Sequence, residues 1–344
     1  MIKYIIYIFK NTIIHWIVRK VKGKQMYNED TWTIGNIVKM LRDEQEVTGS
    51  ELSYGLCSLT TLSRIETSER EMSVIFAMVL FGRLGYHPDK FELYGSKEEY
   101  VQYEQREAME NLKKEGNYAE LELQLIQYKA SWAADIEKDV LQQQFVNGME
   151  GLLCFQKGEY AKSAELLERA VAFTIPEWKD EWLEKAVIGE AELEIMGMLA
   201  DALDADGNVE GAFKIRNNIL TYLEKKPTSR RQMLRIYTEM IAKLAPVLLE
   251  QKNIGQALKW CEDGLAALAE GGRMFHWPTL LYWKGRCLEE LYHTGQAELA
   301  AVEAAYIRAF YIFRLFENVT MAEEVKLHLD KEVPGWEYIK LEKL

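Results

Sequence analysis

Residues 55–66 carry the side chains best suited to recognition chemistry, in the order Gly-Leu-Cys-Ser-Leu-Thr-Thr-Leu-Ser-Arg-Ile-Glu. We predict that Gly55 ends one short helix and that Ser58 caps the next, in which Leu62 and Ile65 face inward. Polar groups on the opposite face can reach the groove of a DNA duplex. The sequence therefore predicts the turn and second helix of a helix-turn-helix, with the outward residues Leu59, Thr60, Ser63 and Arg64.

Other polar residues near this stretch are suited to contacts with the DNA backbone. We expect Arg64 to make the main base contact, because a guanidinium can bond two acceptors on a guanine edge at once. The full set of residues expected to face DNA is Lys39, Arg42, Thr48, Ser58, Leu59, Thr60, Ser63, Arg64 and Arg70.

The charge balance restricts how the chain can hold nucleic acid. The formal net charge is −12, and residues 31–94 contain six Lys or Arg against nine Asp or Glu. Because DNA binding depends on neutralising phosphates, this balance excludes a protein that grips DNA along its whole length. Any DNA contact must be local. The alternative is a helix-turn-helix that dimerises or docks a protein partner without specific DNA binding.

No constellation in the sequence predicts catalysis. Residues 204–208 resemble a calcium loop, but its first and twelfth positions would be Ala202 and Phe213, which lack side-chain oxygen ligands. The five histidines show no metal-ligand spacing, and no glycine-rich phosphate loop follows a strand. No nucleophile stands at a recognisable spacing from a base. We therefore expect a protein that is not an enzyme, with no metal and no cofactor.

Composition favours a helical protein. The chain has six prolines among 344 residues, and Ala, Leu, Glu and Lys are frequent after residue 97, which favours helix over long windows. The four cysteines lie far apart within apolar helical patterns, so we interpret them as buried thiols in a reducing cytoplasm. The fold class predicted is all-α: an N-terminal five-helix helix-turn-helix domain followed by a right-handed, tetratricopeptide-like helical repeat solenoid.

The first 25 residues differ from the rest, with six basic residues and no acid. Their apolar run is interrupted by Lys10, Asn11 and His15, so it is too short and too polar to span a bilayer. We expect a disordered tail, or residues upstream of a translation start at Met26. A basic helix on a membrane surface is the alternative. We expect no membrane partner.

The helix-turn-helix domain is expected over residues 32–95. Its first helix buries Ile34, Ile37, Val38 and Leu41. Thr48, with Glu51, caps the second; the third covers 59–66, the fourth 73–84 and a short fifth 89–94. Gly95 and Ser96 mark the boundary, and Ser96 caps a long helix over 97–114.

A sequence pattern of two helices joined by a short turn then recurs over residues 96–331, before a C-terminal tail at 332–344. Its turns begin at Gly116, Gly158, Gly207 and Lys252, at intervals of 42, 49 and 45 residues. Small residues seven positions before the last three turns, Gly151, Ala200 and Ala245, let paired helices approach closely. Pairs at 279–291 with 296–316 and a capping helix at 321–331 complete the stack. The pattern is similar to the tetratricopeptide repeat, although that repeat is 34 residues long.

The helix-turn-helix sequence followed by these repeats resembles the bacterial peptide-pheromone receptor regulators of the Rgg and PlcR type, over residues 32 to about 331. The resemblance implies an all-α homodimer in which a short signalling peptide binds the concave face of the repeats and changes how the paired domains engage a promoter. Two features depart from the family pattern. Residues 47–49 read Val-Thr-Gly where the family has Leu-Thr-Gln, and the loop over 66–72 lacks the usual Gly and Pro.

The small residues of the repeats, together with Gly285, mark the side of each helix that touches its paired helix. This side fixes which other residues of each helix are expected to face the concave surface of the repeats. Its apolar floor and carboxylates suit an extended peptide with hydrophobic side chains and at least one positive charge. Asparagine side chains can hold peptide backbone. The expected peptide-binding residues are Asn147, Leu152, Phe155, Glu194, Asp201, Asn217, Asn218, Glu239, Tyr282 and Arg286. The alternative interpretation is that the acidic side chains lie on solvent-exposed helix faces and bind no peptide.

These patterns together favour a cytoplasmic transcriptional regulator whose partners are promoter DNA and a short signalling peptide. The alternative is a protein–protein interaction scaffold, in which the repeats hold a partner and the front domain dimerises.

Overall fold

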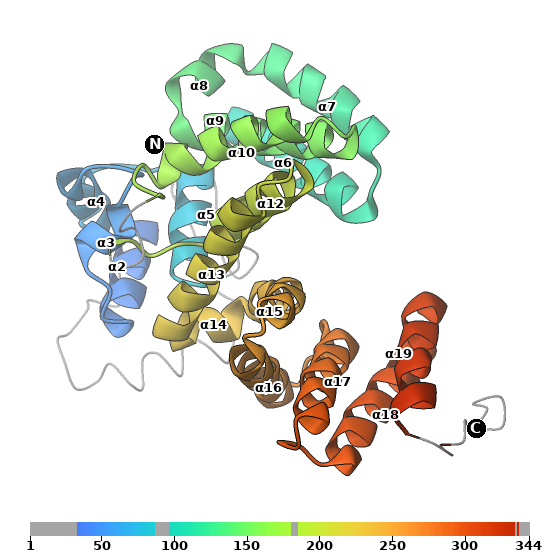
Figure 1. The fold of residues 1–344 in the computed structure, drawn as a ribbon. Helices are drawn as coiled ribbons and strands as arrows, with labels where there is room; N and C mark the ends of the chain where they lie inside the picture. Colours follow the sequence, from blue (N-terminus) through green and yellow to red (C-terminus); the bar gives the residue numbers. More distant parts are fainter. Residues whose placement is uncertain (1–32, 87–95, 180–184, 334–335, 337–344) are drawn as a thin grey trace. The chain divides into compact units, whose positions relative to one another are not determined.

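The computed structural model describes residues 33–86, 96–179, 185–333 and 336. Within these residues every regular element is a helix and none is a strand, which confirms the all-α class (Figure 1). The chain forms two compact units, an N-terminal unit up to Ala212 and a C-terminal unit from Phe213. The expected helix at 89–94, the tail at 1–25 and most of the tail at 332–344 lie outside the described residues.

Four short helices form the helix-turn-helix part of the N-terminal unit. They are α2 (Ile34–Glu44), α3 (Gly49–Ser53), α4 (Leu59–Glu66) and α5 (Val74–Arg83). Thr48, Ser58 and Ser73 cap the last three, because each hydroxyl accepts a hydrogen bond from the backbone N–H three residues on. These local bonds fix where each helix starts, and hence which face of α4 stays outside.

Helices α2 and α4 cross so closely at Gly35 that only a hydrogen atom fits between them. A methyl group there would lie 1.8 Å from the backbone oxygen of Ile65. We expect Gly35→Ala to lower the free energy of unfolding by about 1 to 3 kcal/mol, because the helices must move apart. Gly82→Ala in α5, where nothing lies within 4 Å of the added methyl, should raise it by up to about 1 kcal/mol through helix propensity. Thermal unfolding checks both variants, and equal shifts in Tm would contradict the close crossing.

The remaining helices of the two units follow the predicted repeats. In the N-terminal unit they are α6 (Lys97–Glu115), α7 (Tyr118–Ser131), α8 (Ala133–Lys138), α9 (Val140–Gln156), α10 (Tyr160–Thr174) and α12 (Glu190–Ala205). Helix α13 (Val209–Lys225) runs from one unit into the other. The C-terminal unit continues with α14 (Pro227–Gln232), α15 (Leu234–Glu250), α16 (Ile254–Gly271), α17 (Trp277–His293), α18 (Leu299–Leu315) and α19 (Val319–Glu332). Among the described helices, none combines the length and apolar character needed to cross a bilayer.

The predicted turns share one backbone geometry. At each bend stands a residue of positive φ: Gly116 (72°), Gly158 (78°), Gly207 (90°) and Lys252 (59°). The N–H of the residue after each bend donates to the carbonyl oxygen five residues earlier, at 2.8 to 3.0 Å: Asn117 to Leu112, Glu159 to Cys154, Asn208 to Leu203 and Asn253 to Leu248. This is the Schellman arrangement of a helix C-terminus. The four predicted turns therefore have the same backbone structure.

Small residues lie where paired helices touch, as predicted. A methyl group on Gly151 would come within 2.6 Å of the Leu167 side chain, and one on Gly285 within 2.5 Å of the Tyr306 ring. The sequence did not predict the short helices α8 and α14. Together with the segment between α10 and α12, they supply the length by which these repeats exceed the tetratricopeptide spacing.

All four cysteines are free thiols. Cys154, Cys261 and Cys287 are buried, as expected, whereas Cys57 is half-buried. A hydrogen bond with the Cys287 thiol, together with burial, raises the pKa of Cys261 well above its usual value. The Cys261 thiol therefore stays protonated at neutral pH and is a poor nucleophile.

Candidate functional site

The outer face of α4 has the exposure that the sequence predicted. Leu62 and Ile65 are 1% and 3% exposed and anchor the helix, whereas Leu59 is 56% exposed. Thr60, Ser63 and Arg64 are also exposed, and Arg70 is exposed beyond the end of the helix. Among the described residues, the structure therefore gathers one apolar, two hydroxyl and two cationic side chains on the exposed face of α4 and just beyond its end.

Thr48 and Ser58, which were expected to face DNA, hold helix ends. The Thr48 hydroxyl donates to Glu51 Oε2 at 2.8 Å, and its oxygen accepts from the Glu51 N–H at 3.2 Å. The Ser58 oxygen accepts from the Thr61 N–H at 3.1 Å. Both side chains are exposed, and their hydrogen bonds orient α3 and α4.

Arg42 does not join the exposed face of α4. Its Nε and Nη2 donate to the two carboxylate oxygens of Glu66, at 2.7 and 3.0 Å, and its Nη1 donates to the Val47 carbonyl at 2.9 Å. The hydrogen bond to Glu66 raises the pKa of Arg42. The guanidinium therefore ties the end of α2 to the end of α4, and we leave Arg42 out of the proposed DNA surface. Lys39, on the same helix, is half-buried.

A buried arginine joins the helix-turn-helix part to the repeat helices of the same unit. Arg83, at the end of α5, is 1% exposed, and its Nη2 and Nε donate to the two oxygens of Glu192 on α12, at 2.7 and 3.1 Å. Its Nη1 donates to the carbonyl oxygens of Leu52 and Tyr54, at 3.0 and 2.6 Å. Its Nη2 also donates to the Thr174 carbonyl at 3.2 Å, at the end of α10. One side chain thus connects α3, α5, α10 and α12.

Backbone contacts support the same joint. The Val187 N–H donates to the Glu51 carbonyl at 3.2 Å. Gly55, at φ 68°, leaves no room for a side chain, because a methyl group there would lie 2.0 Å from the Thr174 carbonyl oxygen. Helix α3 and the turn after it are therefore held by packed backbone against the end of α10 and the segment before α12. Sequence reasoning missed this joint, although a lone charge inside the nearly all-apolar α5 was a signal for it.

The expected peptide-binding residues divide between the two compact units. In the N-terminal unit, Asn147 is buried and donates to the Gln143 carbonyl at 2.8 Å, while Leu152 and Phe155 are half-buried. Glu194 and Asp201 are half-buried on α12, and Lys113 Nζ lies 3.3 Å from Glu194 Oε2. Burial acts to lower the pKa of Lys113, but Glu110 and Glu194 outweigh it and raise that pKa. A peptide cation at Glu194 would have to compete with Lys113.

In the C-terminal unit the expected peptide-binding residues differ in exposure. Asn217, Asn218 and Glu239 are half-buried, and Glu239 pairs with Lys243 of its own helix at 2.8 Å. Tyr282, however, is 2% exposed, and its hydroxyl donates to Glu324 of α19 at 3.0 Å. Arg286 donates to the Tyr282 oxygen at 3.4 Å. The capping helix α19 covers this face of α17, so Tyr282 lines no open surface.

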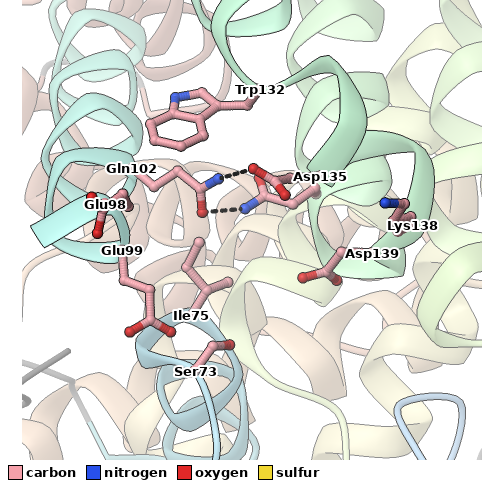
Figure 2. A pocket seen from close by; sticks show the side chains of 10 residues that line it. Ser73, Ile75, Glu98, Glu99, Gln102, Trp132, Asp135, Lys138 and Asp139 are labelled. Atoms are coloured by element: carbon pink, nitrogen blue, oxygen red, sulfur yellow. Dashed lines mark hydrogen bonds between the residues drawn. The ribbon is translucent and has the colours of Figure 1, made fainter. Parts of the chain in front are cut away.

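A polar cavity of about 300 Å³, not foreseen from the sequence, lies beside the start of α5 (Figure 2). Its walls are Ser73, Ile75, Glu98, Glu99, Gln102, Trp132, Asp135, Lys138, Asp139 and Gln142. Gln142 donates to Gln102 at 2.9 Å, and Gln102 donates to Asp135 at 3.4 Å. Glu99 and Asp139 accept hydrogen bonds from the backbone at the starts of α6 and α9. Three helix N-termini meet here, and carboxylates offset their partial positive charge.

The described residues are helical throughout their regular elements, and in the N-terminal unit an exposed helix-turn-helix is fixed to repeat hairpins. No family model matches the sequence, and no curated protein sequence does. Solved structures resemble the chain. PlcR from Bacillus thuringiensis, in complex with the peptide PapR7 and DNA, is 17% identical over 85% of this chain and 98% of that chain, with a TM-score of 0.47.

Two streptococcal proteins are similar over a comparable length. The SHP pheromone receptor Rgg2 from Streptococcus dysgalactiae is 16% identical, covering 88% of this chain and 100% of that chain, with a TM-score of 0.37. The competence regulator ComR from Streptococcus vestibularis, in its apo form, is 16% identical, covering 88% of this chain and 98% of that chain, with a TM-score of 0.43.

Proposed function

We propose that this chain is a cytoplasmic transcriptional regulator that binds promoter DNA through α4, as a homodimer of the kind that its sequence resemblance implies. The observation that carries the proposal is the face of α4 that is exposed in the described structure, with Thr60, Ser63 and Arg64 outward and Leu62 and Ile65 in the core. A capped helix with this division of faces can lie in the major groove and present hydroxyl and guanidinium donors to base edges.

The proposed effector is a short peptide bound by the repeat helices. Helix α12 supports this because it carries both the candidate peptide ligands Glu194 and Asp201 and the residue Glu192 that holds Arg83. A peptide that shifted α12 would act on α5 through a buried ion pair rather than through a flexible tether. In this proposal the joint at Arg83 couples peptide binding to the position of α4.

The acidic charge balance of the helix-turn-helix domain favours one alternative function, the binding of a protein partner. With six basic and nine acidic residues over 31–94, the helix-turn-helix could serve as a protein-docking or dimerising module. The exposed Leu59 on α4 suits such a contact as well as a thymine methyl group.

Selection of DNA from a random duplex pool by the full chain separates these functions. The regulator proposal predicts enrichment of one sequence motif over successive rounds, at a salt concentration that suppresses nonspecific binding. Enrichment of no motif, with the folded protein recovered intact, would favour the docking module.

We expect the double variant Glu194→Ala, Asp201→Ala to bind short hydrophobic peptides with one positive charge more weakly than the parent. The loss should be up to about 1 kcal/mol, or roughly 5-fold in Kd, because the partly exposed ion pair of the peptide cation with these carboxylates is removed. Titration calorimetry with a panel of such peptides measures it. The double variant Glu115→Ala, Glu120→Ala removes the same charge at the α6–α7 turn and is the control.

Two outcomes of the calorimetry would count against this assignment. Unchanged affinity in the Glu194→Ala, Asp201→Ala variant would remove these carboxylates from the peptide site. Failure of the parent to bind any peptide of the panel would favour the protein-docking alternative.

A further inference from the structure

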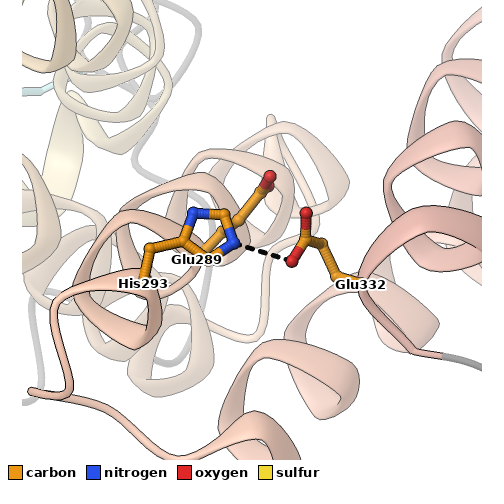
Figure 3. A group of neighbouring side chains, drawn as sticks. All are labelled: Glu289, His293 and Glu332. Carbon is orange, nitrogen blue, oxygen red and sulfur yellow. Dashed lines mark hydrogen bonds and ion pairs between the residues drawn. The ribbon is translucent and has the colours of Figure 1, made fainter.

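A mixed histidine and carboxylate cluster lies between α17 and α19 in the C-terminal unit (Figure 3). Glu289 and His293 stand four residues apart on α17 and therefore share one face of that helix. Glu332, the last residue of α19, faces them. One ligand atom from each residue lies within 4.8 Å of the other two, and His293 Nε2 is 2.8 Å from Glu332 Oε2.

Neighbouring side chains prepare Glu289 to act as a ligand. The Tyr306 hydroxyl donates to Glu289 Oε2, and His328 Nδ1 lies 2.9 Å from the same oxygen. Supporting groups of this kind orient the ligands of metal sites, and here they occupy one carboxylate oxygen and leave Oε1 turned to the cluster.

A cation already stands between the two carboxylates. Lys331 Nζ is 3.4 Å from Glu289 Oε1 and 2.5 Å from Glu332 Oε1. The Lys331 side chain is 65% exposed, so it can swing into solvent without leaving a cavity. The Lys331 ammonium group shows that positive charge is stabilised between the two carboxylates. A divalent metal ion at this place would also bind the imidazole nitrogen of His293, which an ammonium ion does not use as a ligand.

We propose that Glu289, His293 and Glu332 bind Zn²⁺, with water as the fourth ligand, and that the ion fastens the capping helix α19 to α17. One imidazole and two carboxylates form a donor set that suits zinc. Zinc bonds of about 2.1 Å place tetrahedral donors roughly 3.4 Å apart. The 2.8 Å pair of His293 Nε2 and Glu332 Oε2 must therefore open slightly, while the other donor pairs, which lie within 4.8 Å, adjust around the ion. The His293 side chain, 47% exposed, has the freedom to make this adjustment, whereas the Glu332 side chain is only 8% exposed. The proposal does not depend on DNA or peptide binding.

Zinc titration of the full chain against a chromophoric chelator tests the site. The parent should bind one ion, and His293→Gln should weaken binding by at least about tenfold, because a direct ligand is lost. Lys331→Met should tighten binding, because the competing ammonium ion is removed. Glu290→Gln, next along α17 and 3.4 Å from Lys252, changes the same helix without touching the cluster and should leave binding unchanged.

Measurements with Co²⁺ and with Mg²⁺ distinguish metal coordination by His293 from a change in structure or in local charge. Co²⁺ in the parent should give the visible absorption of a four-coordinate site, and His293→Gln should abolish it while its circular dichroism stays that of the parent. Mg²⁺ should not compete, because it prefers six oxygen ligands. Equal zinc affinity in the parent and His293→Gln, weaker binding in Lys331→Met, or displacement of zinc by millimolar Mg²⁺ would each overturn the proposal.

Discussion

Replacing Glu192 with alanine will lower the free energy of unfolding by about 3 to 5 kcal/mol. The side chains of Arg83 and Glu192 are 0% and 4% exposed, so the substitution leaves a guanidinium buried without its counter-charge. Loss of one partner of a buried ion pair is far more costly than loss of a surface pair, because the remaining charge cannot recover its hydration. The three backbone carbonyls around Arg83 would still accept hydrogen bonds, but they carry no net charge.

Urea unfolding followed by circular dichroism, with hydrogen exchange of the α5 and α12 amides, measures this loss. Glu122→Ala is the matched control in the same unit, because Glu122 pairs with Lys157 at 2.7 Å where both side chains are more than 40% exposed. The control should lose less than about 1 kcal/mol. Equal losses in the two variants would show that the Arg83 joint does not hold the helix-turn-helix in place.

Arg64→Ala should weaken binding to the selected DNA by about 1 to 3 kcal/mol, or roughly 5- to 150-fold in Kd, and relax its base preference at one position. Arg64 lies one turn after Thr60 on the exposed face of α4. Fluorescence anisotropy with labelled duplexes, varied one base pair at a time, measures both effects.

Two further substitutions distinguish a direct base contact by Arg64 from a general effect of positive charge on DNA affinity. Lys114→Ala, at the exposed end of α6, removes the same charge far from α4 in sequence and should change Kd little. Arg70→Ala should weaken all duplexes alike if Arg70 contacts phosphate. A parent-like affinity and sequence preference in Arg64→Ala would rule out direct readout by this residue.

The sequence predicted those features of the fold that depend on neighbouring residues. The caps at Thr48, Ser58 and Ser96 and the bends at Gly116, Gly158 and Gly207 each involve hydrogen bonds within about six residues. Such bonds follow from residue type and spacing alone. The exposed face of α4 was predictable for the same reason, because helical spacing divides Leu62 and Ile65 from Thr60 and Arg64.

Features that join distant segments could not be predicted in this way. Arg42 looked like a surface cation of α2, but its partner Glu66 is 24 residues away. Arg83 and Glu192 are 109 residues apart, and Lys113 and Glu194 are 81 apart. Tyr282 was assigned to an open surface because its own helix pattern does not reveal that α19 covers it. A lone charge in an apolar helix indicates a buried partner, but it does not identify that partner.

The ratio of affinities for the selected duplex and a scrambled duplex, measured at about 50 mM and about 200 mM salt, tests the central claim most directly. If α4 reads bases, both affinities will fall with salt but the ratio will stay large, at roughly a thousandfold or more. The ratio should also drop in Arg64→Ala. A ratio near one at the higher salt concentration, in a folded protein, would contradict the proposal that this chain is a sequence-specific regulator.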